Sequence, residues 1–246
     1  MSVSTLESMV GTRVLLLSPH ADDVAYSIGG IVVRLSRQAD VLLMTVFGRS
    51  GWALPAALRR KSVDFISALR EQEDRAYCER RQLGYVRLPC PDSFVMGYDE
   101  ATELCEVPND DPRTVNVVMI IEAAVASLRP HFVIAPCAVG GHIDHHIVRG
   151  AAETLRQVDV LYYEDVPYSA SLSMPELERR LLRQGKTPAV TVDIEHQLES
   201  KCADMWSYRS QTCSRTVREM LLHAGRVGAG NVRYAERLWR RANGRA

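Results

Sequence analysis

The amino-acid sequence predicts an α/β fold, a Rossmann-like three-layer αβα sandwich with a mostly parallel sheet. Short runs of consecutive apolar residues alternate along the chain with longer segments of helical periodicity. This alternation is typical of a parallel sheet that is covered by helices on both faces. The apolar runs also lack the in-and-out alternation of a strand with one wet face, so they fit strands that are buried on both sides.

The first strand–helix–strand unit lies near the N-terminus. Residues 13–18 form an apolar run that is bounded by turn residues and is too short for a helix, which predicts a strand. A helix is predicted over 24–36, because the apolar residues between Ile28 and Leu35 recur at helical spacing on one face. Residues 40–47 repeat the apolar pattern and predict a second buried strand.

The next unit contains a longer and more charged helix. It is predicted over 63–83 and is closed by Gly84 as a C-cap, because glycine readily adopts the left-handed conformation that ends many helices. Residues 85–88 predict a third, short strand. A further helix is predicted over 115–128 and stops before Pro130, since proline disfavours helical backbone at the preceding residue.

The alternation continues to about residue 164 and then becomes less regular. A strand is predicted over 131–135, a helix over 142–157 and a strand over 158–163. The last third predicts a strand over 190–194 and helices over 198–208 and 216–222. No composition shift marks a boundary, so we expect one domain spanning residues 1–246.

The composition limits the kinds of partner that this protein has. Its 246 residues are 46% hydrophobic and carry a formal net charge of zero, without a basic stripe, so neither a nucleic-acid nor a membrane-surface partner is expected. The chain shows no signal-peptide pattern and no run of about 18 apolar residues. Its six scattered cysteines are expected to be reduced thiols of a cytoplasmic protein. A homo-oligomer remains open.

Two clusters of potential metal ligands stand out from the rest of the sequence. They are Ser-Pro-His-Ala-Asp-Asp at 18–23 and Gly-His-Ile-Asp-His-His at 141–146. Each follows a predicted strand and opens a predicted helix. Ligands of open parallel sheets lie beyond the carboxyl ends of the strands, so we expect both clusters at one rim, beneath the long connections 49–62 and 89–113.

The residue types in the clusters predict a catalytic zinc site. Imidazole and carboxylate both suit zinc, and a catalytic zinc commonly keeps three protein ligands and one open position. His20, Asp23 and His145 would make such a set. Each cluster alone would also fit a helix cap or a solvated first turn. Their joint occurrence at two strand ends favours the metal site.

The remaining cluster residues suggest a division of catalytic labour. Asp22 would take a proton from the attacking water, as a general base does. A protonated His142 would stabilise the developing oxyanion or protonate the leaving nitrogen. Asp144 would hydrogen-bond one of the histidines and fix its tautomer. His146 is expected to face away from the metal.

The two clusters resemble the paired motifs of the PIG-L or LmbE-like deacetylase family, a PHPDDE-type motif after the first strand and a later HxDH motif. Members of that family are zinc-dependent enzymes that remove N-acetyl groups, commonly from N-acetylglucosamine units. The resemblance covers roughly residues 12–165. It implies the same roles: His20, Asp23 and His145 as zinc ligands, Asp22 as base, His142 as acid or oxyanion stabiliser, and Asp144 as the orienting carboxylate.

The resemblance also implies two substrate contacts. Arg70 begins an Arg-x-x-Glu pattern whose arginine contacts substrate hydroxyls in the family, and Asp92 matches a sugar-contacting aspartate. The chain departs from the family motif at two positions, where Ala21 replaces the usual proline and Val24 the usual glutamate. These departures concern the substrate class more than the zinc.

The expected function is therefore that of a zinc-dependent hydrolase. It would remove an N-acetyl or other N-acyl group from a small amino-sugar-containing metabolite, in natural-product or thiol-cofactor biosynthesis. Fe²⁺ or Co²⁺ can occupy the same ligand set. Two alternatives remain: a metal-dependent amidase or esterase acting on a peptide-like or thiol-conjugate substrate, and a non-catalytic metal-binding Rossmann-like module.

Overall fold

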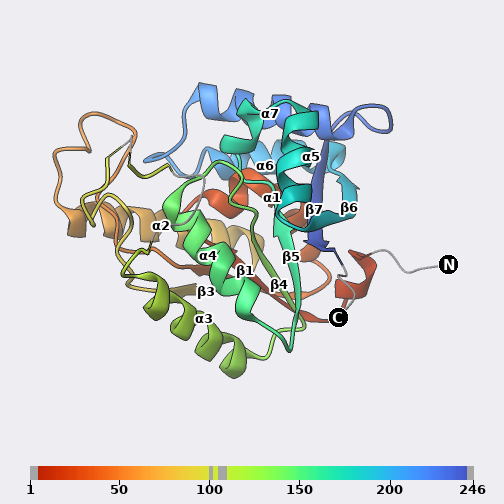
Figure 1. The fold of residues 1–246 in the computed structure, drawn as a ribbon. Helices are drawn as coiled ribbons and strands as arrows, with labels where there is room; N and C mark the ends of the chain where they lie inside the picture. The colour runs from red at the N-terminus through yellow and green to blue at the C-terminus, as the bar shows by residue number, and fades with distance from the viewer. Residues whose placement is uncertain (1–4, 100–101, 105–109, 243–246) are drawn as a thin grey trace.

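The computed structural model describes residues 5–99, 102–104 and 110–242 and contains one continuous seven-stranded sheet (Figure 1). The strand order is β3-β2-β1-β4-β5-β7-β6. The strands are β1 (Arg13–Ser18), β2 (Asp40–Thr45), β3 (Gly84–Arg87), β4 (Phe132–Pro136), β5 (Asp159–Tyr163), β6 (Lys186–Asp193) and β7 (Ala235–Arg241).

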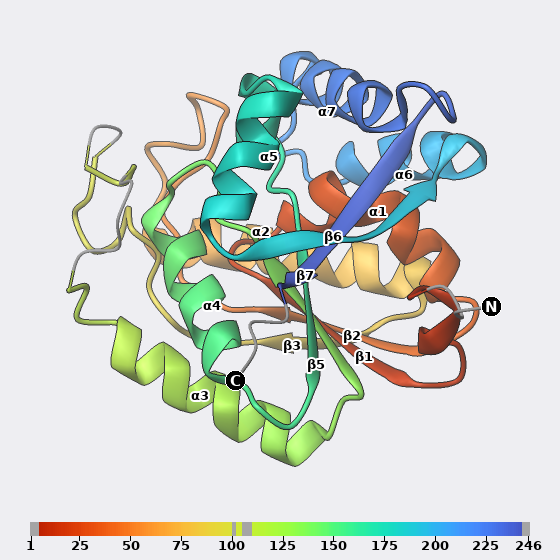
Figure 2. The ribbon, with the colours of Figure 1, turned by 45° about the vertical axis from the view of Figure 1, so that its right-hand side comes forward.

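Most of the sheet is parallel. Strand β1 pairs in parallel with β2 and β4, and the same direction continues outward to β3 and β5. The exception is β7, which lies antiparallel between β5 and β6. Figure 2 shows these two C-terminal strands continuing the sheet beyond β5. The predicted α/β class with a mostly parallel sheet is confirmed.

Helices cover both faces of the sheet and make it a three-layer structure. Helices α1, α2, α6 and α7 pack on the face to which Val14 and Leu16 of β1 point, and α3, α4 and α5 pack on the face of Leu15 and Leu17. The helices are α1 (Asp23–Leu35), α2 (Val63–Arg81), α3 (Thr114–Leu128), α4 (Ile143–Thr154), α5 (Met174–Arg183), α6 (Leu198–Met205) and α7 (Ser214–Gly228), with short 3₁₀ turns η1 (Glu7–Met9), η2 (Tyr168–Ser171) and η3 (Glu195–Gln197).

Because both faces of β1 are covered, its last five residues are all buried. This explains its continuous apolar sequence. No helix among the described residues is both long and apolar enough to cross a membrane. The five described cysteines are free thiols, whereas Cys105 lies outside the described residues.

Three features of the prediction are corrected. Gly84 is not the C-cap of α2; Gln82 takes the left-handed conformation with φ 56°, and Gly84 begins β3. A Cβ at Gly84 would lie 2.9 Å from Leu42, so close strand packing requires the glycine. Helix α5 and strand β7 were not predicted from the sequence.

The fold brings the two predicted clusters together at one rim. Strand order reverses between the neighbours β1 and β4, because the chain proceeds from β1 to β2 on one side and from β4 to β5 on the other. Such a switch point leaves a crevice at the carboxyl ends of the strands. The first cluster begins at the end of β1 and the second lies a few residues after β4, so the expectation that they share a rim is confirmed.

Candidate metal centre

The three predicted metal ligands converge at the start of helices α1 and α4. His20 Nδ1 lies 3.3 Å from Asp23 Oδ2, and His145 Nε2 lies 3.4 Å from the same oxygen. The three ligand atoms lie within 4.8 Å of one another. Asp23 and His145 are buried, and His20 is largely so. A metal ion that drew these atoms to about 2 Å would require only a small contraction.

Two observations show that this set suits a cation. His145 Nε2 is buried and has no hydrogen-bond partner among the described residues, which is expected of an atom reserved for a metal. Burial alone would lower the pKa of His20, but the carboxylates of Asp144 and Asp23 outweigh burial and raise it to about 10. The surroundings of the ring therefore stabilise positive charge.

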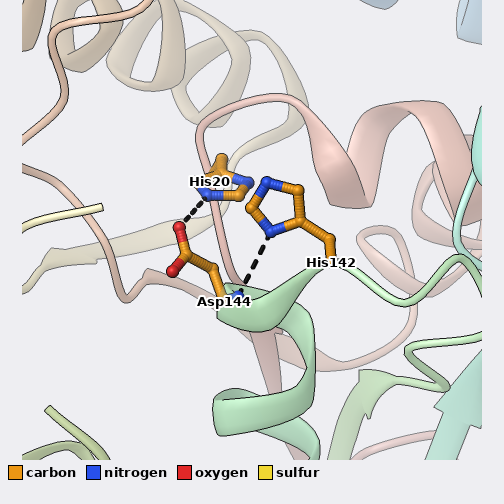
Figure 3. A group of neighbouring side chains, drawn as sticks. All are labelled: His20, His142 and Asp144. Atoms are coloured by element: carbon orange, nitrogen blue, oxygen red, sulfur yellow. Dashed lines mark hydrogen bonds and ion pairs between the residues drawn. The ribbon is translucent and has the colours of Figure 1, made fainter. Parts of the chain in front are cut away.

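A buried carboxylate orients each histidine of this set. His20 Nε2 lies 2.8 Å from Asp144 Oδ2, as Figure 3 shows, so Nδ1 is the ring nitrogen that faces Asp23 and the other possible ligand atoms. His145 Nδ1 lies 2.7 Å from Asp165 Oδ1, which leaves Nε2 free. The predicted orienting partner of Asp144 is thus His20. Asp165 was not predicted, because only the sheet topology brings it to His145.

A second group of possible ligands, His20, His142 and Asp144, overlaps the first (Figure 3). The oxygens of Asp144 are already engaged: Oδ2 also accepts a hydrogen bond from Ser93 N at 2.9 Å, and Oδ1 lies 2.7 Å from Arg113 Nη1. The guanidinium would repel a second cation. Asp144 therefore serves better as a support for His20 than as a ligand.

Asp22 lies beside the metal set and lines the cavity above it. It precedes α1 with φ 110°, a conformation that non-glycine residues rarely adopt. Burial and the neighbouring Asp23 carboxylate raise the pKa of Asp22, and the Arg70 guanidinium, 3.7 Å away, partly opposes them. A carboxylate with a raised pKa is a better proton acceptor than an ordinary one.

His142 is the N-cap of α4. Its Nδ1 accepts a hydrogen bond from Asp144 N at 3.2 Å, so the ring proton is on Nε2, which lies 3.6 Å from Glu103 Oε2. Burial lowers the pKa of His142. These contacts favour a neutral imidazole that donates through Nε2, in place of the protonated ring expected from the sequence.

A cavity of about 210 Å³ opens above these residues. As predicted, the connections 49–62 and 89–113 supply much of its wall, including Trp52, Phe94 and the buried Asp92. Asp92 Oδ1 accepts a hydrogen bond from Val95 N at 2.9 Å. Glu103 also lines the cavity and was not predicted. His146 is buried on α4 outside both possible ligand groups.

Arg70 lies in the cavity wall, but its guanidinium is directed at the protein. It donates to Ser50 Oγ at 2.9 Å and to the carbonyl oxygen of Ala21 at 3.0 Å, besides pairing with Asp22. These contacts anchor the turn that carries the first cluster. A contact between Arg70 and substrate remains a prediction.

The C-terminal segment 208–212 completes the wall from the other side. Ser210 donates to Glu73 through both its backbone N–H and its hydroxyl, and Tyr208 donates to Asp74 at 3.0 Å. These bonds attach the segment to α2. They place Gln211, a lining residue that the sequence did not identify, at the cavity.

Comparison with known proteins gives the family. Residues 15–155 match the family model described as PIG-L, GlcNAc-PI de-N-acetylase. The chain is 38% identical to a 2'-N-acetylparomamine deacetylase of Streptomyces fradiae, over 92% of this chain and 89% of that protein.

Solved structures confirm the fold. The zinc-inhibited form of teicoplanin deacetylase Orf2 has a TM-score of 0.72 at 22% identity, covering 95% of this chain and all of that one. The hydratase GalB of Pseudomonas putida, which acts on 4-carboxy-2-hydroxymuconate, has a TM-score of 0.63 at 16% identity over 96% and 98% of the two chains. Because the fold thus occurs with different reactions, the sequence match and the two clusters decide the family. The chain belongs to the PIG-L family of de-N-acetylases.

Proposed function

We propose that this protein is a zinc-dependent hydrolase that removes an N-acetyl group from a small amino-sugar-containing metabolite, in natural-product biosynthesis. One observation carries the proposal: the possible ligand atoms of His20, Asp23 and His145 converge beside a cavity that His20, Asp23 and Asp22 line. The similarity to a 2'-N-acetylparomamine deacetylase supports the amide bond and the amino-sugar class.

Zinc is the ion that we propose for the set of two imidazoles and one carboxylate, although Fe²⁺ and Co²⁺ suit the same donors. A divalent ion bound there would supply Lewis acidity toward the amide carbonyl and lower the pKa of a nearby water. The hydrogen bonds that Asp144 and Asp165 accept from the two rings would hold both in the correct tautomer before the ion arrives.

Asp22 and His142 then have complementary tasks. Asp22 takes the proton of the water that attacks the amide carbon, and the Nε2–H of His142 donates to the oxygen on which negative charge develops. A neutral His142 would have to become an imidazolate to protonate the leaving nitrogen. Asp22 therefore returns its proton to that nitrogen as the carbon–nitrogen bond breaks, giving acetate and the free amine.

The charge of the cavity wall supports a substrate with ammonium groups. Asp92 and Glu103 both line the cavity, and within the described part of the chain neither forms an ion pair with lysine or arginine. The nearby imidazole of His142 lowers the pKa of Glu103, so this carboxyl group is ionised near neutral pH. Free amino groups on an amino sugar would complement these two carboxylates.

Acetate release from N-acetylated amino sugars tests the proposal. The zinc-loaded protein would be assayed with mono-N-acetylated aminoglycoside precursors, N-acetylglucosamine and an acetate ester of similar size. We expect amide hydrolysis that is fastest for the cationic amino sugars. Hydrolysis of the ester alone would support the esterase alternative and contradict the deacetylase.

A further inference from the structure

We infer that Arg113 is a positioning residue of the metal centre, which fixes Asp144 so that His20 presents its Nδ1 to the ion. The inference rests on the metal site of the proposed function but not on its substrate. It concerns a residue at the end of connection 89–113, far in the sequence from both ligand clusters. Nothing in the sequence pattern identified it.

The side chain of Arg113 is held rigidly. It is 6% exposed and lies between the rings of Phe47 and Tyr98, with its guanidinium carbon 5.0 and 5.6 Å from their centroids. Asp111 accepts hydrogen bonds from Nε at 2.9 Å and Nη2 at 2.7 Å. This bidentate pair orients the guanidinium plane and leaves Nη1 directed elsewhere.

The remaining nitrogen reaches the metal centre. Arg113 Nη1 lies 2.7 Å from Asp144 Oδ1 and also donates to the carbonyl oxygen of Pro91 at 3.0 Å. The other oxygen of Asp144 lies 2.8 Å from His20 Nε2. Asp144 is therefore held on one side by a fixed cation and on the other by a metal ligand, as Figure 3 shows for the His20 side.

The charge of Arg113 has a specific consequence for Asp144, which is completely buried. The guanidinium of Arg113, 2.7 Å from Oδ1, and the imidazole of His20, 2.8 Å from Oδ2, both stabilise the ionised form of this buried carboxyl group. An ionised Asp144 must accept the proton of His20 Nε2. The Nδ1 lone pair is then available to the ion.

The two orienting carboxylates differ in this respect. Asp165, which orients His145, receives its second hydrogen bond from the backbone N–H of Val139 at 3.1 Å and forms no ion pair with arginine or lysine in the described chain. Loss of Arg113 should therefore act through Asp144 and His20 alone. This difference supplies a control within the same site.

A double-mutant cycle on zinc affinity tests the inference. Affinity would be measured by competition with a chromophoric chelator for the wild type, Arg113→Gln, Asp144→Asn and the double variant. Each single change should weaken zinc binding by about 10-fold, the lower range for the loss of an outer-shell partner. The double variant should be little weaker than the worse single one, because both changes break one chain of contacts.

The control cycle pairs Arg113→Gln with Asp165→Asn. Here the two fold-losses of zinc affinity should multiply. If Arg113→Gln does not fold, Arg113→Lys replaces it; we expect it to bind zinc more weakly than wild type and to be non-additive with Asp144→Asn.

Two results would overturn the inference: unchanged zinc affinity in the folded Arg113 variant, or multiplicative losses in the Arg113 and Asp144 cycle. Either result would restrict Arg113 to a structural clamp. Neither would affect the proposed function, which fails only if the zinc-loaded wild type releases no acetate.

Discussion

At the scale of single residues, the centre depends on a division between atoms that face the ion and atoms that hold them. In each histidine of the proposed ligand set, one ring nitrogen lies among the possible metal-binding atoms and the other lies against a buried carboxylate. Asp22 differs from its neighbour Asp23 because it has an unusual backbone conformation and lies beside the guanidinium of Arg70. We therefore propose separate tasks for these two adjacent aspartates.

Replacing Asp22 with Asn should abolish most turnover while zinc stays bound. The amide keeps the size of the carboxylate but cannot accept the proton, and general-base catalysis typically contributes about 10²- to 10⁴-fold. Turnover would be followed by acetate release and metal content by elemental analysis of the same sample. Wild-type turnover in the variant would exclude Asp22 as the base.

Glu103→Gln should raise the KM for a cationic amino sugar about tenfold, equivalent to about 1.4 kcal/mol, without changing the KM for neutral N-acetylglucosamine. The amide retains the shape but removes the charge that would face an ammonium group. Glu122→Gln, on the exposed surface of α3, is the matched control. An equal fall in kcat for both substrates would instead assign Glu103 to the support of His142.

At the scale of elements, helix α2 joins the sheet to the C-terminal segment through buried acidic groups. Asp74 accepts hydrogen bonds from Thr45 of β2, Tyr85 of β3 and Tyr208. Burial nevertheless raises the pKa of Asp74 to about 6. The next residue along α2 toward the N-terminus, Glu73, binds Ser210. The cavity wall built by segment 208–212 therefore depends on α2.

The raised pKa of Asp74 predicts a pH dependence of stability. The folded state binds this proton more tightly than the unfolded chain, whose pKa is near 3.8. Its stabilising contribution is complete below about pH 4 and is lost as pH rises through about 6, by roughly 3 kcal/mol in total. Urea unfolding between pH 4.5 and 7 should show this slope in wild type and a smaller one in Asp74→Asn. If the free energy of unfolding changed equally with pH in wild type and in Asp74→Asn, the raised pKa of Asp74 would be contradicted.

At the scale of the whole molecule, the sequence predicted best what local pattern determines. Strand β1 is buried on both faces and was recognisable from six residues. The ligand clusters could be located because each lies within a few residues of the end of a strand. Strand β7 was not predicted because four of its seven residues are charged. Its sequence is Ala-Glu-Arg-Leu-Trp-Arg-Arg. Its pairing with β5 and β6 decides its conformation, and such context overrides strand propensity.

Helix α5 could have been found, because Ser173 caps its N-terminus and Pro175 stands in its first turn. Arg113 and Asp165 could not have been assigned their roles. Their partners are 31 and 20 positions away, at Asp144 and His145, and only the sheet topology brings them together. Contacts between residues that are distant in the sequence cannot be predicted from the spacing of residues in a motif.

Zinc binding should also stabilise the whole fold. An ion that binds only the folded state adds about 2.7 kcal/mol at a free concentration 100 times its dissociation constant. Thermal unfolding of metal-free protein should therefore shift upward on adding zinc. His145→Ala should lose most of the shift, whereas His196→Ala, which changes an exposed histidine outside the site, should keep it. If His145→Ala showed the full zinc-induced rise in unfolding temperature, zinc would have to bind at another site.

The most direct measurement of the central claim is reconstitution of metal-free protein with zinc, recording acetate release from a mono-N-acetylated amino sugar against bound zinc per chain. We predict no turnover without metal and a linear rise that ends at one zinc per chain. Full turnover in protein shown to be free of metal, or no turnover at one zinc per chain, would contradict a zinc-dependent N-deacetylase.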